Sequence, residues 1–406
     1  MLAAQTAPRQ GWRELWLITV GHSLTHWYPA TFYLLLPLIG NELGLSYSQI
    51  GLIMTCQYIA SAVANVPGGV LVDTVGRKGL LMAVSLFWVG FPYLLISFTH
   101  SYVMLLICIA LVGFGNSLWH PTAIPTLGQR YPDRKGLVLS LHGMGGNVGD
   151  AIAPVVIGAA LAAFTWREVV VMNVVPGLVV ALLMFAFLGS MRLGRKAASG
   201  EGQSLAQYME GLRQLLRNRA LVLLSVGSSF RTMTQTALLT FLPVYLANEM
   251  HYSPALVGAC LFAVQAAGFA AAPVGGYLSD RMGRKQILMS SMLTSAVVLV
   301  GMAIAGASPI FVGLIAILGF FLYATRPVIQ AWLLDVTPKN MGGSSIGVLF
   351  GAQAVGAALG PLAAGMVADR QGLLATFYFL AATIVVANLF VFWTPTGPVV
   401  AGKDAR

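Results

Sequence analysis

The sequence predicts an all-α integral membrane protein of twelve transmembrane helices, arranged as two pseudo-symmetric six-helix bundles. Of the 406 residues, 57% are hydrophobic and only 9% are charged, whereas an average soluble domain carries about 25% charged residues. Apolar runs of the length that spans a bilayer, about 20 helical residues, recur along the whole chain. In addition, the two halves of the chain are similar to each other at an offset of about 206 residues.

Only short polar gaps separate the apolar runs, so we expect a compact bundle. Lipid admits only helices or closed barrels, and these runs do not alternate with the period of two that barrel strands require. The first run is too long for the core of a signal peptide, so it is expected to be the first helix of the mature protein. The expected spans are 13–40, 48–71, 79–98, 102–129, 136–163, 168–190, 220–247, 255–279, 287–306, 309–336, 343–369 and 374–393.

The basic residues follow membrane topology rather than a nucleic-acid-binding pattern. The net charge is +10, but with a cytoplasmic N-terminus 19 of the 23 Lys and Arg residues fall in the tails and inward loops. The exceptions are Arg167 and Arg370 in outer loops, and Arg231 and Arg326 within expected spans. This positive-inside bias predicts that both termini are cytoplasmic, and no nucleic-acid partner is expected. The three cysteines lie in expected spans, so no disulfide framework is expected.

An internal repeat divides the chain into two halves. The stretch GGVLVDTVGRKG at 68–79 aligns with GGYLSDRMGRKQ at 275–286, and further glycines and prolines agree at a similar offset. We therefore expect an N-terminal six-helix half at 1–190, a basic cytoplasmic linker at 191–219 and a C-terminal six-helix half at 220–406. The repeat is parallel, because six helices return the chain to the cytoplasmic side.

The doubled loop resembles the signature loop of the major facilitator superfamily. Its pattern G-x-L-x-D-x-x-G-R-K lies between the second and third spans and again between the eighth and ninth. The resemblance covers essentially the whole chain and implies the major facilitator fold and a transporter. The stretches GHSLTHW (21–27), GFGNSLWHP (113–121) and GLVLSLHGMGGNVG (136–149) resemble the fosmidomycin-resistance branch, whose members are proton-driven exporters of drugs or metabolites.

Each copy of the loop places a carboxylate at a helix end and two basic residues across a tight glycine turn. These charges can form a contact between helices or halves that is made and broken during transport. The simpler interpretation is a solvated basic loop that only fixes topology. We name these residues the loop latch: Asp73, Arg77, Lys78, Asp280, Arg284 and Lys285. Asp335, at the cytoplasmic end of the tenth span, is expected at the membrane interface.

The fifth span carries small residues at four-residue spacing, in GMGGNVGDAIAPVVIGA at 143–159. Gly145 and Gly149 predict close helix packing whatever is transported, and Pro154 predicts a bend. The stretch also resembles the family's antiporter-associated motif, although Asp150 is unusual there and Ala153 precedes the proline where the family often has glycine. Because close packing explains the same glycines, the motif alone does not establish export.

Five ionisable residues inside the spans are the expected substrate-binding residues, since such residues are costly in lipid and usually functional. They are His22 and His26 in the first span, His120 in the fourth, Arg231 in the seventh and Arg326 in the tenth. The family resemblance implies that these four helices line the central cavity. With a rise of about 1.5 Å per residue, His22, His120, Arg231 and Arg326 are expected at or slightly inside the membrane midplane.

His120 and Arg326 occupy equivalent positions in the two halves. Trp119-His120-Pro121 aligns with Thr325-Arg326-Pro327, and both prolines, Pro121 and Pro327, predict helix kinks. We expect His120 to face a water-filled cavity across from Arg326. The alternative is a histidine whose ring is hydrogen-bonded to a backbone carbonyl at the kink.

The chemistry of these residues favours an anionic or zwitterionic substrate. Arginine is effectively always protonated, and its planar fork matches a carboxylate or phosphonate. Histidine changes charge near physiological pH, so His22, His26 and His120 are candidates for proton-sensitive binding. Asp150 is the clearest acidic residue near the middle of a span, and with His142 it is the candidate for proton coupling. Asp150 has the alternative roles of an ion pair with a cavity arginine or of helix packing.

No metal site and no cofactor are expected. His22 and His26 share one helix face, and imidazole suits several transition metals. However, two nearby arginines argue against a bare cation, though not against a metal held in an anionic chelate.

The sequence therefore predicts a proton-coupled secondary transporter that exports a small anionic or zwitterionic drug or metabolite by alternating access. The alternatives are an importer or symporter of an organic acid, a carrier of a metal-chelate complex, and a membrane sensor or assembly factor. An enzyme is not expected, because no phosphate-binding loop, HExxH motif or convincing nucleophile–base pair is found. The expected partners are the small-molecule substrate, protons and the lipid bilayer, and the expected state is a monomer in a bacterial inner membrane.

Overall fold

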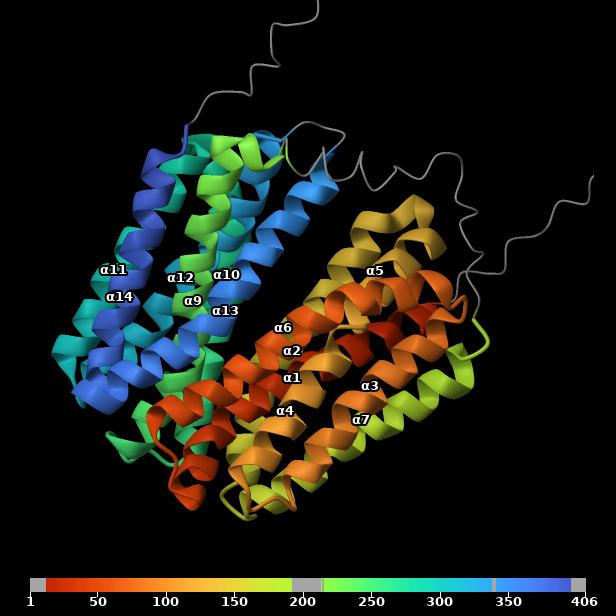
Figure 1. The fold of residues 1–406 in the computed structure, drawn as a ribbon, viewed down its shortest axis with the longest axis horizontal. Coiled ribbons are helices and arrows are strands. Elements are labelled where there is room, and N and C mark those ends of the chain that lie inside the picture. The colour runs from red at the N-terminus through yellow and green to blue at the C-terminus, as the bar shows by residue number, and fades with distance from the viewer. Residues whose placement is uncertain (1–11, 192–212, 214, 338–340, 396–406) are drawn as a thin grey trace, which may run out of the picture. The chain divides into compact units, whose positions relative to one another are not determined.

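The protein is almost entirely helical. The computed structural model describes residues 12–191, 213, 215–337 and 341–395 (Figure 1), and within these ranges it contains no strand. The first set of helices is α1 (Trp12–Leu43), α2 (Tyr47–Thr74), α3 (Lys78–Ile96), α4 (Tyr102–Asn116), α5 (Trp119–Arg130), α6 (Lys135–Ala160) and α7 (Trp166–Leu188), with a 3₁₀ turn at Pro132–Arg134. The second set is α9 (Arg219–Asn248), α10 (Pro254–Met282), α11 (Arg284–Ala305), α12 (Pro309–Asp335), α13 (Gly342–Gln371) and α14 (Leu373–Trp393).

Length and apolar composition explain why these segments form membrane helices. Among the described residues, eight helical segments are long and apolar enough to cross a bilayer: α3, α4 with α5, α7, and α10 to α14. The other long helices, α1, α2, α6 and α9, have 26 to 32 residues. In chain order these segments correspond to the twelve expected spans, and the all-α fold class is confirmed.

Local sequence signals fix several helix ends. The N-cap Thr165 and Glu168 form a capping box at the start of α7, in which the Glu168 carboxylate accepts from the Thr165 N–H at 2.8 Å. Gly283, between α10 and α11, has a φ of +98°, and Gly372, between α13 and α14, has a φ of +86°. Glycine adopts these angles at no steric cost, so the chain can turn sharply at both places.

The fourth expected span, 102–129, is interrupted rather than continuous. α4 ends at Asn116 and α5 begins at Trp119, immediately before His120. Pro121 has no N–H for the carbonyl of Ser117, four residues earlier, and its ring crowds that carbonyl. This explains why the helix breaks one turn before the proline. In contrast, α6 and α12 continue through Pro154 and Pro327.

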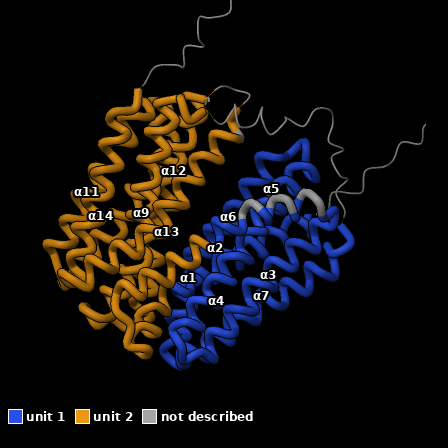
Figure 2. The backbone as a smooth tube through the Cα atoms, viewed as in Figure 1, with its two compact units in different colours: residues 1–32, 60–197 blue, residues 33–59, 198–406 orange. Residues whose placement is uncertain are grey.

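The described chain forms two compact units (Figure 2). The first consists of residues 1–32 and 60–197, and the second consists of residues 33–59 and 198–406. The second unit thus contains the end of α1 and the beginning of α2 in addition to the C-terminal helices. The internal repeat alone does not indicate this division.

Close contacts hold the 33–59 segment on α13 within the second unit. The Thr55 hydroxyl donates to the carbonyl of Ala358 at 2.6 Å. A Cβ atom at Gly51 would lie 2.2 Å from the carbonyl oxygen of Pro361, so the two backbones touch there. Asp369 accepts the N–H groups of Tyr47 and Ser48 at 2.7 and 2.9 Å. A carboxylate from α13 therefore caps the first turn of α2, where it also complements the helix dipole.

Small residues bring helix pairs into backbone contact in both units. On α6, a Cβ atom at Gly145 would lie 2.6 Å from the carbonyl oxygen of Thr19, and one at Gly149 would lie 2.1 Å from that of Ser23. On α13, a Cβ atom at Gly356 would lie 2.0 Å from the carbonyl oxygen of Ser229. Thus α6 packs directly on α1, and α13 packs directly on α9, through residues with no side chain.

Candidate functional site

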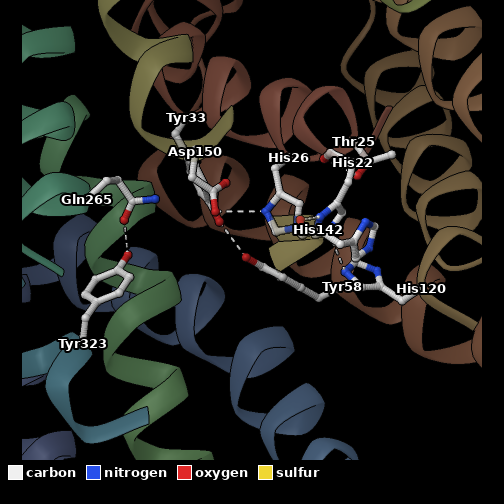
Figure 3. A network of polar contacts seen from close by, with 10 residues as sticks. All are labelled: His22, Thr25, His26, Tyr33, Tyr58, His120, His142, Asp150, Gln265 and Tyr323. Carbon is white, nitrogen blue, oxygen red and sulfur yellow. Dashed lines mark hydrogen bonds and ion pairs between the residues drawn. The ribbon is translucent and has the colours of Figure 1, made fainter. Parts of the chain in front are cut away.

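Four histidines and one aspartate gather in the first compact unit (Figure 3). His22 and His26 lie one turn apart on α1, His120 lies at the start of α5, and His142 and Asp150 lie on α6. One ring nitrogen from each of His22, His26 and His120 lies within 4.8 Å of the other two. We name His22, His26 and His120 the histidine cluster. The structure therefore brings together the substrate-binding and proton-coupling candidates that the sequence placed in the N-terminal half.

His22 is the buried member of the histidine cluster, with 4% of its surface exposed. Its Nδ1 lies 2.6 Å from the carbonyl oxygen of His142. Since a carbonyl can only accept, Nδ1 carries the proton and Nε2 carries the lone pair. That Nε2 lies 3.2 Å from Nε2 of the exposed His120. The cluster thus extends from a buried ring to an accessible one.

His26 is paired with Asp150. Its Nδ1 lies 2.9 Å from the Asp150 carboxylate, and the two side chains are 30% and 29% exposed. The sequence left open whether Asp150 pairs with an arginine, and the structure pairs it with a histidine instead. The carboxylate fixes the neutral His26 ring with its proton on Nδ1, which places the lone pair on Nε2.

His142 stacks on His22 rather than pairing with Asp150. The two ring centroids are 3.9 Å apart and the rings are inclined by 14°. Both ring nitrogens of His142 are buried and have no hydrogen-bond partner among the described residues. His142 is therefore held at this point by ring stacking rather than by side-chain hydrogen bonds.

Gly146 makes room for the imidazole rings. A Cβ atom at this position would lie 2.8 Å from Cε1 of His22 and 3.0 Å from Nε2 of His26. Any side chain on α6 at this point would therefore displace the rings. The sequence reasoning did not select Gly146, because it treated the glycines of this helix only as helix-packing residues.

Arg231 lies in the second compact unit, where neutral groups hold its guanidinium. Nε donates to the Thr325 hydroxyl at 2.9 Å, and the other two nitrogens donate to the Leu322 carbonyl at 2.8 Å and to the Gln235 side chain. The residue is only 3% exposed. No carboxylate in the described part of the chain forms an ion pair with it. Arg231 therefore joins α9 to α12 while its positive charge lacks a protein counter-ion.

Arg326 follows Thr325 on α12 and has a different environment. It is exposed, and within the described residues it forms no hydrogen bond or ion pair. A guanidinium in this state can bind an incoming carboxylate or phosphonate through its fork. Of the two expected anion-binding arginines, Arg326 is the one whose donors are open to a ligand.

The second copy of the loop latch forms a network within the second unit. Arg284 bridges Asp280 and Asp335, with its Nε 3.1 Å from the Asp335 carboxylate. Lys285 donates to the carbonyl oxygens of Phe392 and Thr394 at the end of α14. These contacts join α10, α11, α12 and α14. Asp335, expected only at the membrane interface, is a direct partner of the latch.

The first copy of the loop latch is described only in part. Lys78 donates to the carbonyl of Val72, and Arg77 is the exposed N-cap residue of α3. The side chain of Asp73 lies outside the described residues. A role for these residues in conformational change stays a prediction.

Replacing Arg284 by alanine is expected to slow transport about threefold with little change in the apparent KM. Partly exposed ion pairs contribute about 0.2–1 kcal/mol each, and this variant removes two pairs that lie away from the arginines and histidines of the candidate site. The measurement is transport rate against substrate concentration. Arg281→Ala is the matched control, because Arg281 lies over the Tyr277 ring and makes no ion pair among the described residues. An equal loss in both variants, or a loss of affinity alone, would contradict the latch role.

A match to a known family covers nearly the whole chain. A model described as the Major Facilitator Superfamily matches residues 15–268 and 224–406. The match confirms the family that the doubled loop motif indicates.

Similar proteins of named function include transporters of several kinds. The Fosmidomycin resistance protein of Escherichia coli (strain K12) is 25% identical over 399 residues, covering 96% of this chain and 95% of that protein. The Hexuronate transporter of Bacillus subtilis (strain 168) is 27% identical over 387 residues, covering 91% and 92%. A solved structure of a bacterial homologue of the human lysosomal transporter Spinster has a TM-score of 0.80 at 16% identity, covering 95% and 97%. At that identity the likeness concerns the fold alone.

Proposed function

Because the chain belongs to the major facilitator superfamily, we propose that it is a proton-coupled secondary transporter of a small anionic or zwitterionic organic molecule. It is a membrane-spanning transporter and not an enzyme. The proposed mechanism is alternating access, with export of the substrate in exchange for protons. The proposed location is a bacterial inner membrane, with both termini cytoplasmic and the chain acting as a monomer.

The observation that carries the substrate class is the exposed guanidinium of Arg326, which follows Thr325, the residue that the buried Arg231 contacts. Arg231 has its three nitrogens engaged by neutral acceptors, so it supplies positive potential and a fixed position rather than free donors. Arg326 supplies the donors. A buried charge without a counter-ion is costly in a membrane protein, and a bound anion offsets that cost.

The names of the relatives support the same class. Hexuronate and phosphoglycerate, in the names of two similar transporters, are organic anions, and fosmidomycin is a phosphonate. A second candidate function is import of an organic acid together with protons; the name of the Hexuronate transporter supports the organic-acid substrate. The direction of transport separates the two functions.

The proton-coupling proposal rests on the contact between His26 and Asp150. A carboxylate 2.9 Å from an imidazole can exchange a proton with it through a single hydrogen bond. Within the described part of the first compact unit, the rings of His22, His120 and His142 also lie near this pair. Asn at position 150 keeps the shape and a hydrogen-bonding oxygen but cannot take up a proton, so the Asp150→Asn protein should bind substrate without coupling it to protons.

Purified protein in liposomes with a trapped pH dye tests the proposed function. The compounds are fosmidomycin, hexuronate, phosphoglycerate and one lipophilic cation, added from either side to give the direction. We expect anion-dependent proton movement in the wild type, a loss of at least tenfold in Arg326→Ala, and substrate binding without proton movement in Asp150→Asn. Arg370→Ala removes an equivalent exposed positive charge from the end of α13 and should behave as wild type.

Three outcomes would contradict the proposal at different points. A response to the cation alone would overturn the substrate class. Unchanged anion transport in Arg326→Ala would overturn the role of that arginine. Anion movement that is independent of the pH gradient in the wild type would overturn proton coupling.

A further inference from the structure

The geometry points to a binding site for a divalent transition-metal ion, formed by Nε2 of His22, His26 and His120. In the sequence, only the one-turn spacing of His22 and His26 indicates such a site. This inference goes beyond the proposed function, because it concerns binding by the first compact unit and requires no transport.

The neutral rings of His22 and His26 carry their protons on Nδ1, as they would in a metal site that uses Nε2 as the ligand atom. A ligating histidine donates its second N–H to a carbonyl or carboxylate, and that contact holds the ring in position. Nδ1 of His22 faces the His142 carbonyl oxygen at 2.6 Å, and Nδ1 of His26 faces the Asp150 carboxylate at 2.9 Å. Both contacts leave the lone pair on Nε2, the nitrogen that would bind the ion.

The separations of the nitrogens suit a shared ion. Two nitrogens bound to tetrahedral zinc at about 2.0–2.1 Å lie about 3.3 Å apart, and Nε2 of His22 and Nε2 of His120 are 3.2 Å apart. In the metal-free protein this contact is an N–H···N hydrogen bond, and the ion would replace its proton. The ligand nitrogens of the three rings lie within 4.8 Å of one another, so none of their separations would have to shorten by more than about 1.5 Å. The exposed His120 side chain can supply that movement by rotation.

The room beside Gly146 and the neutral state of the His22 ring are also compatible with a bound metal ion. Gly146 leaves room beside Cε1 of His22 and Nε2 of His26 that any side chain would fill. The stacked ring of His142 is compatible with a neutral His22, since two cationic rings 3.9 Å apart would repel each other. Neutral imidazole is the form that coordinates metals.

The donor set defines the class of ion. Three imidazoles without a thiolate suit zinc, copper, nickel or cobalt, whereas magnesium and calcium prefer oxygen ligands. Three protein ligands leave one tetrahedral position for water or for a group of a bound molecule. We therefore expect one ion per chain with an open coordination position.

The test is zinc binding to the full-length protein purified without a polyhistidine tag, measured by calorimetry, with cobalt as the spectroscopic probe. We expect saturation at one zinc per chain and a visible absorption band from tetrahedral cobalt. His26→Ala and His120→Ala should each weaken zinc binding at least tenfold and abolish the cobalt band. Asp150→Ala should weaken binding about 10–100-fold, because it removes the partner that orients His26.

His251→Ala is the matched control, since His251 lies in the turn between α9 and α10, outside the cluster. The absence of saturable zinc binding to the wild type would overturn the site, and so would equal affinities in wild type, His26→Ala and His120→Ala. Proton movement is measured separately with a chelator present. Anion transport without zinc binding would contradict only the metal site, and zinc binding without anion transport would contradict only the proposed function.

Discussion

Replacing Gly149 by alanine is expected to lower the free energy of unfolding by about 1–3 kcal/mol, the usual cost of overpacking. The added Cβ would lie 2.1 Å from the carbonyl oxygen of Ser23. That atom belongs to the backbone of α1 and cannot move aside without the helix. We therefore expect α1 and α6 to separate, with less folded protein in the membrane. Thermal unfolding in detergent and the yield of monodisperse protein measure the effect.

Gly143→Ala is the control, because Gly143 lies on the same helix and a Cβ there would meet nothing within 4 Å. Alanine is a better helix former than glycine by about 0.5–1 kcal/mol, so this variant should be as stable as wild type or more stable. In the second unit, Gly356→Ala should behave like Gly149→Ala, and Gly351→Ala should behave like Gly143→Ala. Equal stabilities of Gly149→Ala and Gly143→Ala would show that the close contact is not required.

Replacing Arg231 by methionine is expected to raise the apparent KM for an anionic substrate at least tenfold, or about 1.4 kcal/mol, while the protein stays folded. Burial of a charge without a counter-ion is costly, so removing the charge offsets much of the loss of three hydrogen bonds. The Leu322 carbonyl keeps a partner, since the Thr325 hydroxyl donates to it at 2.6 Å. The measurements are transport rate against substrate concentration and thermal unfolding.

Arg231→Lys separates charge from geometry. Lysine keeps the positive charge, but its single nitrogen cannot reach three acceptors as the planar fork does. If the charge serves the substrate, the lysine variant should transport with a KM within about threefold of wild type, or ~0.7 kcal/mol. Loss of folded protein in both variants would instead assign Arg231 a purely structural role, and normal transport by Arg231→Met would exclude it from anion binding.

The helical class of the fold and the order of its membrane spans could be predicted from the sequence. The lengths of the apolar runs predict where the membrane-spanning helices lie. The repeated GRK loop indicates the family and the order of the spans. The position of the break in the fourth span differs from the expected bend because a proline disturbs the carbonyl four residues before it. The break at Ser117 lies at the carbonyl that Pro121 disturbs, four residues before the proline.

The residues of the candidate site could be predicted from the sequence, but the contacts between them could not. The one-turn spacing of His22 and His26 places them on one face, yet the rotation of α6 decides which of them meets Asp150. That rotation follows from backbone contact at Gly145 and Gly149, and spacing alone does not specify it. For Arg231, the contact with Gln235 at i+4 follows from helix geometry. The contacts with Thr325 and Leu322 depend on how α9 packs against α12.

The contact between Asp369 and the start of α2 has a consequence for how the protein is made. The N–H groups of Tyr47 and Ser48 and the carboxylate that binds them are more than 300 residues apart in the chain. The 33–59 segment is therefore synthesised long before the helix on which it packs. Contacts of such long sequence separation form late and slow folding. Until α13 is synthesised, the segment must remain in the bilayer without its capping carboxylate and without the backbone that Gly51 contacts, so the second compact unit is completed only near the end of translation.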